Sequence, residues 1–152
     1  MVQELDDIDL RILEALQDDA RTPLVRLARD LGVSDTTVRA RIHRLIRHFG
    51  VKFVVDVDPE VLGLSYSFLA ARVQGPAMAR TIERMSELPE IIFLGRTLGG
   101  YDLMAELVCR NNNDMIRVLD AIRAIPGITQ VDTYAVLRVE KENWRFTELA
   151  RD

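Results

Sequence analysis

Residues 24–45 have the sequence LVRLARDLGVSDTTVRARIHRL, and this stretch decides how the first third of the chain folds. Apolar residues recur at helical spacing up to Leu31, and Gly32 is suited to the left-handed backbone conformation that ends a helix. Ser34 is a typical N-cap residue, and the residues after it again follow a helical pattern. We therefore predict two short helices joined by a glycine turn, which is a helix-turn-helix.

The second of these helices is expected to have two unlike faces. Val38, Ile42 and Leu45 form an apolar side, whereas the opposite side carries short polar residues and arginines and is suited to enter a DNA major groove. The whole chain has a net charge of -4, but five basic residues and one acidic residue lie between Ser34 and Lys52. Because phosphate binding depends on where the cations lie, this local excess favours DNA binding. A helical hairpin that never contacts nucleic acid is the alternative.

The composition is that of a folded protein. The chain has 152 residues, of which 48% are hydrophobic and 29% charged, enough for one ordinary domain or two small ones. Neither a membrane span nor a secretory signal fits the short apolar runs and the acidic N-terminus, so we expect a cytoplasmic protein with no membrane partner. The single cysteine, Cys109, cannot form an internal disulfide and is expected in the core.

The first domain is predicted to span residues 1–57. Its opening segment is amphipathic, and Asp6 and Asp9 have the spacing of a capping box at its start. Packed against the helix-turn-helix, this helix completes a three-helix unit. Residues 51–57 are β-branched and aromatic and predict a strand, the wing of a winged helix, which ends at Pro59. Residues 58–64 are then expected to form a hinge.

The second domain, residues 65–152, contains an internal repeat. Two amphipathic helical segments each end at a Leu-Pro-Glu-Ile or Ile-Pro-Gly-Ile corner, because Pro89 and Pro126 cannot continue a helix, and a strand follows each corner. With a strand predicted before each helix, at residues 65–73 and 101–108, the order becomes βαββαβ. This is the ferredoxin-like arrangement, and the chain as a whole is predicted to be of the α+β class.

A four-stranded sheet with both helices on one side leaves its other face open. We expect this face to carry residues Phe68, Ala70, Phe93, Leu103, Ala105 and Leu107. A second copy of the same sheet is the simplest cover for so small a domain, which predicts a homodimer. Two helix-turn-helix units related by a twofold axis would contact half-sites about 34 Å apart on double-stranded DNA.

Four segments together resemble one known family. They are LDDIDLRIL at 5–13, the helix-turn-helix at 26–45, DPEVLGL at 58–64 and GGYDL at 99–103, and their order and spacing are similar to those of Lrp/AsnC transcriptional regulators. The resemblance implies an N-terminal winged helix joined to a βαββαβ domain of the RAM type. It also implies dimers that assemble into tetramers or octamers and bind an amino acid effector between dimers. The implied function is sequence-specific, amino acid-responsive regulation of transcription.

The resemblance assigns the recognition helix to residues 34–47. Arg39 is placed to contact guanine, a contact that contributes about 1–3 kcal/mol of discrimination. Thr36 and Thr37 lie at the helix start, where short side chains and free backbone N–H groups approach phosphates or bases. Arg41 is expected either to form a surface ion pair or to contact DNA, and the sequence favours neither. The predicted DNA-binding residues are Ser34, Thr36, Thr37, Arg39, Arg41 and Arg44.

The resemblance assigns effector binding to a glycine turn and a later strand. Asp102 is suited to an effector ammonium group, and the two glycines allow close approach of backbone N–H groups to its carboxylate. The chain departs from the family at Val131, where a threonine is frequent, and in its wing, which is short and lacks an internal glycine. The predicted effector-binding residues are Gly99, Gly100, Tyr101, Asp102 and Thr133.

Two other functions compete with the regulator. One is an interaction module that has lost DNA affinity. The other is an enzyme, because sirohaem decarboxylases resemble the same two-domain architecture. The only histidines, His43 and His48, lie in the presumed recognition helix and not in the second domain, which argues against haem-type catalysis, and their spacing argues against a metal pair. We therefore predict no catalytic residue, no metal and no cofactor.

Overall fold

The computed structural model describes residues 4–143 and 147–150. The chain divides into an N-terminal unit, Met1–Val55 with Glu140–Asp152, and a C-terminal unit, Asp56–Val139, each with its own core. The C-terminal segment thus belongs to the N-terminal unit, whereas the sequence analysis placed it in the second domain. No helix in the described residues is long and apolar enough to cross a membrane.

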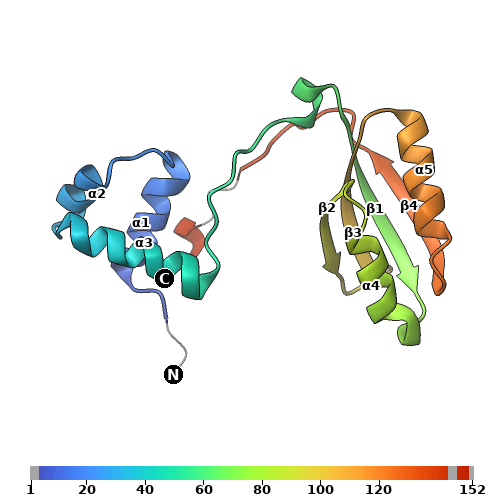
Figure 1. Cartoon of the computed structure of the whole chain (residues 1–152), viewed down its shortest axis with the longest axis horizontal. Coiled ribbons are helices and arrows are strands. Elements are labelled where there is room, and N and C mark those ends of the chain that lie inside the picture. The colour runs from blue at the N-terminus through green and yellow to red at the C-terminus, as the bar shows by residue number, and fades with distance from the viewer. Residues whose placement is uncertain (1–3, 144–146, 151–152) are drawn as a thin grey trace. The chain divides into compact units, whose positions relative to one another are not determined.

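Three helices make up most of the N-terminal unit (Figure 1). The predicted capping box is confirmed, since the Asp9 N–H donates to Asp6 Oδ1 at 3.0 Å and the Asp6 N–H donates to Asp9 Oδ2 at 3.2 Å. Gly32 has φ 68° and ends the second helix, as predicted. The core of the unit contains Ile12 and Leu45, both almost fully buried. The elements are α1 (Asp7–Asp18), α2 (Leu24–Leu31), α3 (Asp35–Phe49) and the short 3-10 helix η3 (Thr147–Ala150), which contacts α1.

The predicted wing is wrong. Residues 51–57 form no strand, and Val54 and Val55 are 77% and 90% exposed. A β-branched segment becomes a strand only when another segment supplies its hydrogen bonds, and no strand of the described chain pairs with this one. The predicted hinge contains a 3-10 helix, η1 (Pro59–Leu62), in which Asp58 Oδ1 accepts a hydrogen bond from the Glu60 N–H at 2.9 Å.

The C-terminal unit has the predicted βαββαβ order. Its four strands form one antiparallel sheet in the order β2-β3-β1-β4, and both long helices pack on the same face (Figure 1). Pro89 and Pro126 follow the ends of the two helices, in agreement with their predicted role as stop signals. The elements are β1 (Ser65–Val73), the 3-10 helix η2 (Gly75–Ala77), α4 (Met78–Ser86), β2 (Ile91–Arg96), β3 (Leu103–Cys109), α5 (Asn112–Arg123) and β4 (Ile128–Ala135).

The sheet has one covered and one open face, and three residues lie on the opposite face from the one predicted. Leu103, Ala105 and Leu107 are at most 1% exposed and belong to the core beneath the helices. Because side chains alternate along a strand, Met104 and Glu106 take their place on the open face. In β3 both alternating sets of positions contain apolar residues. The sequence pattern alone therefore did not show which of the two sets the helices cover. Phe68 and Phe93 remain partly exposed, as expected for the open face.

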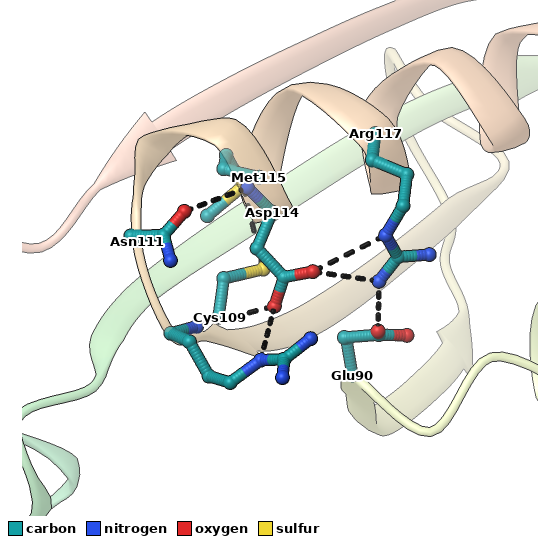
Figure 2. A network of polar contacts seen from close by, with 7 residues as sticks. Glu90, Cys109, Asn111, Asp114, Met115 and Arg117 are labelled. Carbon is teal, nitrogen blue, oxygen red and sulfur yellow. Dashed lines mark hydrogen bonds and ion pairs between the residues drawn. The ribbon is translucent and has the colours of Figure 1, made fainter.

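A polar network fixes the first turn of α5 (Figure 2). Asn111 Oδ1 accepts a hydrogen bond from the Asp114 N–H at 3.0 Å, which caps the helix. The Asp114 carboxylate in turn accepts hydrogen bonds from Arg117 and Arg110, and Arg117 also pairs with Glu90 at the start of β2. The hydrogen bonds with these arginines, that of Arg117 foremost, lower the pKa of Asp114 to about 2.

Candidate functional site

The start of α3 is fixed by its N-cap. Ser34 Oγ accepts a hydrogen bond from the Thr37 N–H at 3.1 Å, as the sequence predicted for the cap, and also lies 2.8 Å from Thr37 Oγ1. The N-cap thus uses the Thr37 hydroxyl within the protein, whereas Thr36 is exposed. The positive end of the helix and an exposed threonine hydroxyl therefore lie together at the surface.

Two of the predicted DNA-binding arginines form ion pairs with carboxylates at the start of α1, those of the N-cap Asp6 and of Asp9. Arg41 Nη1 lies 2.7 Å from Asp6 Oδ1 and 3.1 Å from Asp9 Oδ1, and Arg44 Nη2 donates to Asp9 Oδ2. Asp9 is completely buried, while the side chains of Arg41 and Arg44 are 25% and 31% exposed. The hydrogen bond between Arg41 and Asp6 lowers the pKa of Asp6 and raises that of Arg41. The arginines thereby link α3 to α1.

The remaining cations of α3 are more open to solvent. Arg39 and Arg47 are exposed, and neither has an ion pair within residues 4–143 and 147–150. Arg44 also lies 5.4 Å from the centre of the Phe49 ring. A hollow of about 500 Å³ lies along the first turns of α3 and is lined by Asp6, Thr36, Thr37, Ala40, Arg41 and Arg44. The surface thus combines hydroxyl groups, guanidinium groups and a helix N-terminus.

The 99–102 loop is held tightly against β1. The Asp102 N–H donates to the Ala71 carbonyl at 3.0 Å, and Asp102 Oδ2 accepts a hydrogen bond from the Val73 N–H at 2.8 Å. Gly99 has φ 133°, a conformation that favours glycine. The Thr97 hydroxyl closes the turn by donating to the Tyr101 carbonyl at 2.8 Å. One carboxylate oxygen of Asp102 therefore positions the loop.

Tyr101 belongs to a polar cluster at the end of β1 and the beginning of β4. Its hydroxyl donates to Asp132 Oδ2, and Gln130 Nε2 donates to the same oxygen at 3.0 Å. The Arg72 guanidinium lies 5.5 Å from the centre of the Tyr101 ring. The hydrogen bond to Asp132 raises the pKa of Tyr101 to about 12. Sequence reasoning missed Arg72, Gln130 and Asp132, although the alternation of β4 would have placed Gln130 and Asp132 on one face.

Thr133 lies apart from this cluster. It is the neighbour of Asp132 in β4, so the two side chains point to opposite faces of the sheet. Thr133 pairs with the core residue Leu69 of β1, on the side covered by the helices. Its Oγ1 is buried and has no hydrogen-bond partner in the described protein. The structure thus brings Gly99, Gly100, Tyr101 and Asp102 together and separates Thr133 from them.

Two family models match the chain. Residues 5–46 match the AsnC-type helix-turn-helix domain, and residues 67–145 match the Lrp/AsnC ligand binding domain. The chain belongs to the Lrp/AsnC family. Its helix-turn-helix and its RAM-type domain are those of this family's DNA-binding transcriptional regulators, so the predicted family, fold class and general function are confirmed.

Individual Lrp/AsnC relatives are similar over nearly their whole length. The HTH-type transcriptional regulator FL11 of Pyrococcus horikoshii is 33% identical, covering 91% of this chain and 93% of the relative. The regulator LysM of Saccharolobus solfataricus is 29% identical over 88% of this chain and 94% of its own. These names are those of transcriptional regulators rather than enzymes.

Solved structures of AsnC and of another transcriptional regulator share the fold. Escherichia coli AsnC matches with a TM-score of 0.81 and 25% identity, over 93% of this chain and 97% of AsnC. A Neisseria meningitidis transcriptional regulator, solved as a complex with L-Met, matches with a TM-score of 0.82 and 21% identity. That match covers 96% of this chain and 99% of the other, and at this identity it establishes the fold alone.

Proposed function

We propose that two copies of this Lrp/AsnC chain bind a short twofold-symmetric DNA site through the exposed face of α3. The observation that carries the proposal is that Arg39 and Thr36 are exposed, on a helix whose opposite side is packed in the core. Within the described part of the chain, Arg39 makes no ion pair and the Thr36 side chain makes no hydrogen bond. Such a helix presents cations and a hydroxyl group to a groove without first breaking an internal contact.

Each predicted residue has a distinct part in this proposal. Arg39 contacts a base edge, and Ser34, Thr36 and Thr37 bring the helix N-terminus to the phosphate backbone. Arg41 and Arg44 contact phosphate with the part of each guanidinium group that the ion pairs with Asp6 and Asp9 leave exposed. Their ion pairs restrict their rotamers, so their contacts with phosphate cost little additional side-chain entropy.

The effector of the proposed regulator is an amino acid held at the 99–102 loop. The Asp102 carboxylate forms an ion pair with the ammonium group of the effector, and Gly99 and Gly100 allow the ligand to approach the backbone N–H groups closely. Tyr101 belongs to the same loop, whereas Thr133, the remaining predicted residue, lies on the opposite face of the sheet and has no part in this proposal. The Neisseria relative was solved with L-Met, which makes amino acids the first ligands to try. An effector acts here only by binding two assemblies of the protein with unequal affinity.

Fluorescence anisotropy with DNA from the gene's own upstream region tests the proposal. We expect sequence-preferring, salt-sensitive binding that responds to a pool of amino acids, because phosphate contacts release counterions. Arg39→Ala should weaken specific binding by about 1–3 kcal/mol. Arg84→Ala, which removes an exposed arginine of α4, serves as the matched control and should leave binding unchanged. Equal binding by the wild type and Arg39→Ala would show that α3 is not the contact surface and would favour the interaction module.

A further inference from the structure

Asp6 carries a carboxylate on the surface that we propose to bind DNA. The hollow along the first turns of α3 is lined by six residues, and Asp6 is the only acidic one among them. The others include the exposed Thr36 and the guanidinium groups of Arg41 and Arg44. The Asp6 side chain is 50% exposed, so it is open to a group that approaches this surface. A phosphate that enters the hollow therefore meets two cations and one anion among the lining residues.

Asp6 binds Arg41 with the same kind of contact that a phosphate would make. Arg41 Nη1 lies 2.7 Å from Asp6 Oδ1 and 2.5 Å from Asp6 Oδ2. The hydrogen bond from Arg41 lowers the pKa of the Asp6 carboxyl, so this group is ionised at neutral pH. Because a guanidinium group uses the same N–H donors for carboxylates and for phosphates, Asp6 occupies a part of Arg41 that a phosphate oxygen would otherwise contact.

Asp9 holds Arg41 independently of Asp6. Arg41 Nη1 also lies 3.1 Å from Asp9 Oδ1, and the Asp9 side chain is completely buried. Phosphate cannot take the place of a carboxylate that solvent does not reach, so this contact orients Arg41 with or without DNA. The half-exposed Asp6 differs, because an exposed ion pair adds little to stability and exchanges readily with other ions. Asp6 is therefore not needed to orient Arg41, although it reduces what Arg41 offers to DNA.

We propose that Asp6 is an intramolecular competitor of DNA phosphate and limits the sequence-independent affinity of the protein for DNA. Its carboxylate occupies Arg41 and repels phosphate in the hollow, so a contact of this guanidinium group with DNA competes with an ion pair that is already formed. This role rests on the proposed function, the contact of α3 with DNA. Because phosphate contacts carry no sequence information, Asp6 weakens binding to every DNA sequence by the same factor.

Asp6→Asn separates the charge of Asp6 from its role as the N-cap of α1. Asparagine is as good an N-cap as aspartate, and its side-chain oxygen can still accept the hydrogen bond from the Asp9 N–H. We expect Asp6→Asn to bind DNA roughly tenfold more tightly at about 0.1 M salt, the effect of one additional phosphate contact. The plot of log affinity against log salt concentration should become steeper by about 0.9. Fluorescence anisotropy of the full chain with upstream-region DNA and with a scrambled duplex measures both quantities, and the gain should be equal for the two duplexes.

Asp7→Asn is the matched control, because it removes the same charge from the neighbouring exposed residue, which does not line the hollow. It should change the affinity by less than about twofold, since salt screens a charge that makes no contact with the bound DNA. The gain from Asp6→Asn should also be smaller in an Arg41→Gln background, because the group for which Asp6 competes is then absent.

A purely structural role of Asp6 predicts the opposite result, because damage to the start of α1 would weaken DNA binding. The competitor role is overturned if Asp6→Asn binds DNA no more tightly than the wild type, if Asp7→Asn gains as much, or if the gain is unchanged in Arg41→Gln. Failure of the proposed function looks different, since the wild type and Asp6→Asn would then bind neither duplex at low salt, and the competitor role would fall with it. If Arg39→Ala weakens binding while Asp6→Asn leaves it unchanged, the competitor role alone is wrong.

Discussion

At the scale of single residues, Asp9 of the N-terminal unit depends strongly on its partners, because it is a buried charged group. Its carboxylate is completely buried yet contacts two arginines of α3, and it also accepts the Asp6 N–H of the capping box. A buried charge is tolerated only when it is paired and hydrogen-bonded. Asp9 therefore fixes α3 relative to α1, and with it the arrangement of the surface that we propose to bind DNA.

Replacement of Asp9 by alanine should be strongly destabilising, because it leaves Arg41 and Arg44 without their shared partner. We expect a loss of about 3 kcal/mol in the free energy of unfolding, the lower end of the range for broken buried pairs, since both arginines are partly exposed. Urea denaturation measures it. Asp30→Ala, which removes only surface ion pairs with Arg26 and Arg29, is the control and should cost less than about 1 kcal/mol. Equal losses in the two variants would contradict the structural role of Asp9.

At the scale of elements, the beginning of α5 is more strongly fixed than that of α4. Asn111 caps α5 through its side chain, and Asp114 collects hydrogen bonds from Arg110 and Arg117 (Figure 2). Helix α4 has no side-chain cap and instead continues from η2. The network at α5 also bonds to Glu90, so it connects the helix to the start of β2.

The stability contributed by this network should depend on pH. Hydrogen bonds from Arg117 and Arg110 lower the pKa of Asp114 from 3.8 to about 2, so the folded state favours the charged carboxylate. The contribution is therefore complete above the ordinary pKa of 3.8 and is lost as the pH falls toward 2. Urea titrations of the wild type and Asp114→Asn at several pH values measure it. We expect the difference between the two proteins to shrink over this range, and a difference independent of pH would contradict the assignment.

At the scale of the whole molecule, the open face of the sheet is the surface that most needs a partner. Phe93, Met104 and Phe68 are 53%, 40% and 37% exposed and lie on neighbouring strands. Contiguous apolar groups of this kind are usual at protein interfaces and unusual on monomers. We therefore keep the prediction that a second copy of the sheet covers this face.

A charge on that face should break the assembly. Phe93→Glu places a carboxylate where the predicted interface excludes water, so we expect a smaller molecular mass in solution at equal concentration. Size-exclusion chromatography with light scattering measures the mass. Ile116→Glu, at an apolar position of α5 that is 57% exposed, is the control and should leave the mass unchanged. An unchanged mass in Phe93→Glu would show that the copies meet through another surface.

Local chemistry in the sequence determined the elements that depend on a few neighbouring residues. The capping box at Asp6, the left-handed turn at Gly32 and the N-cap at Ser34 were all predicted and are all present. The same holds for the strand and helix order of the C-terminal unit, where proline ends each helix. Each of these features follows from backbone geometry and from hydrogen bonds between residues at most a few positions apart.

Tertiary structure decided everything that depends on distant segments. Residues 51–57 have a strand composition but no pairing partner in the part of the chain that the structure describes. In β3, the helices could have covered either of the two alternating sets of side chains, since both contain apolar residues. The ion pairs that engage Arg41 and Arg44 join residues about thirty positions apart, and no local pattern marks them. Thr133 and Asp132 are adjacent in sequence but face opposite sides of the sheet. Local patterns therefore specify the helices and strands. Which strands pair, which face of the sheet a side chain occupies and which charged groups form ion pairs are determined only when these elements pack.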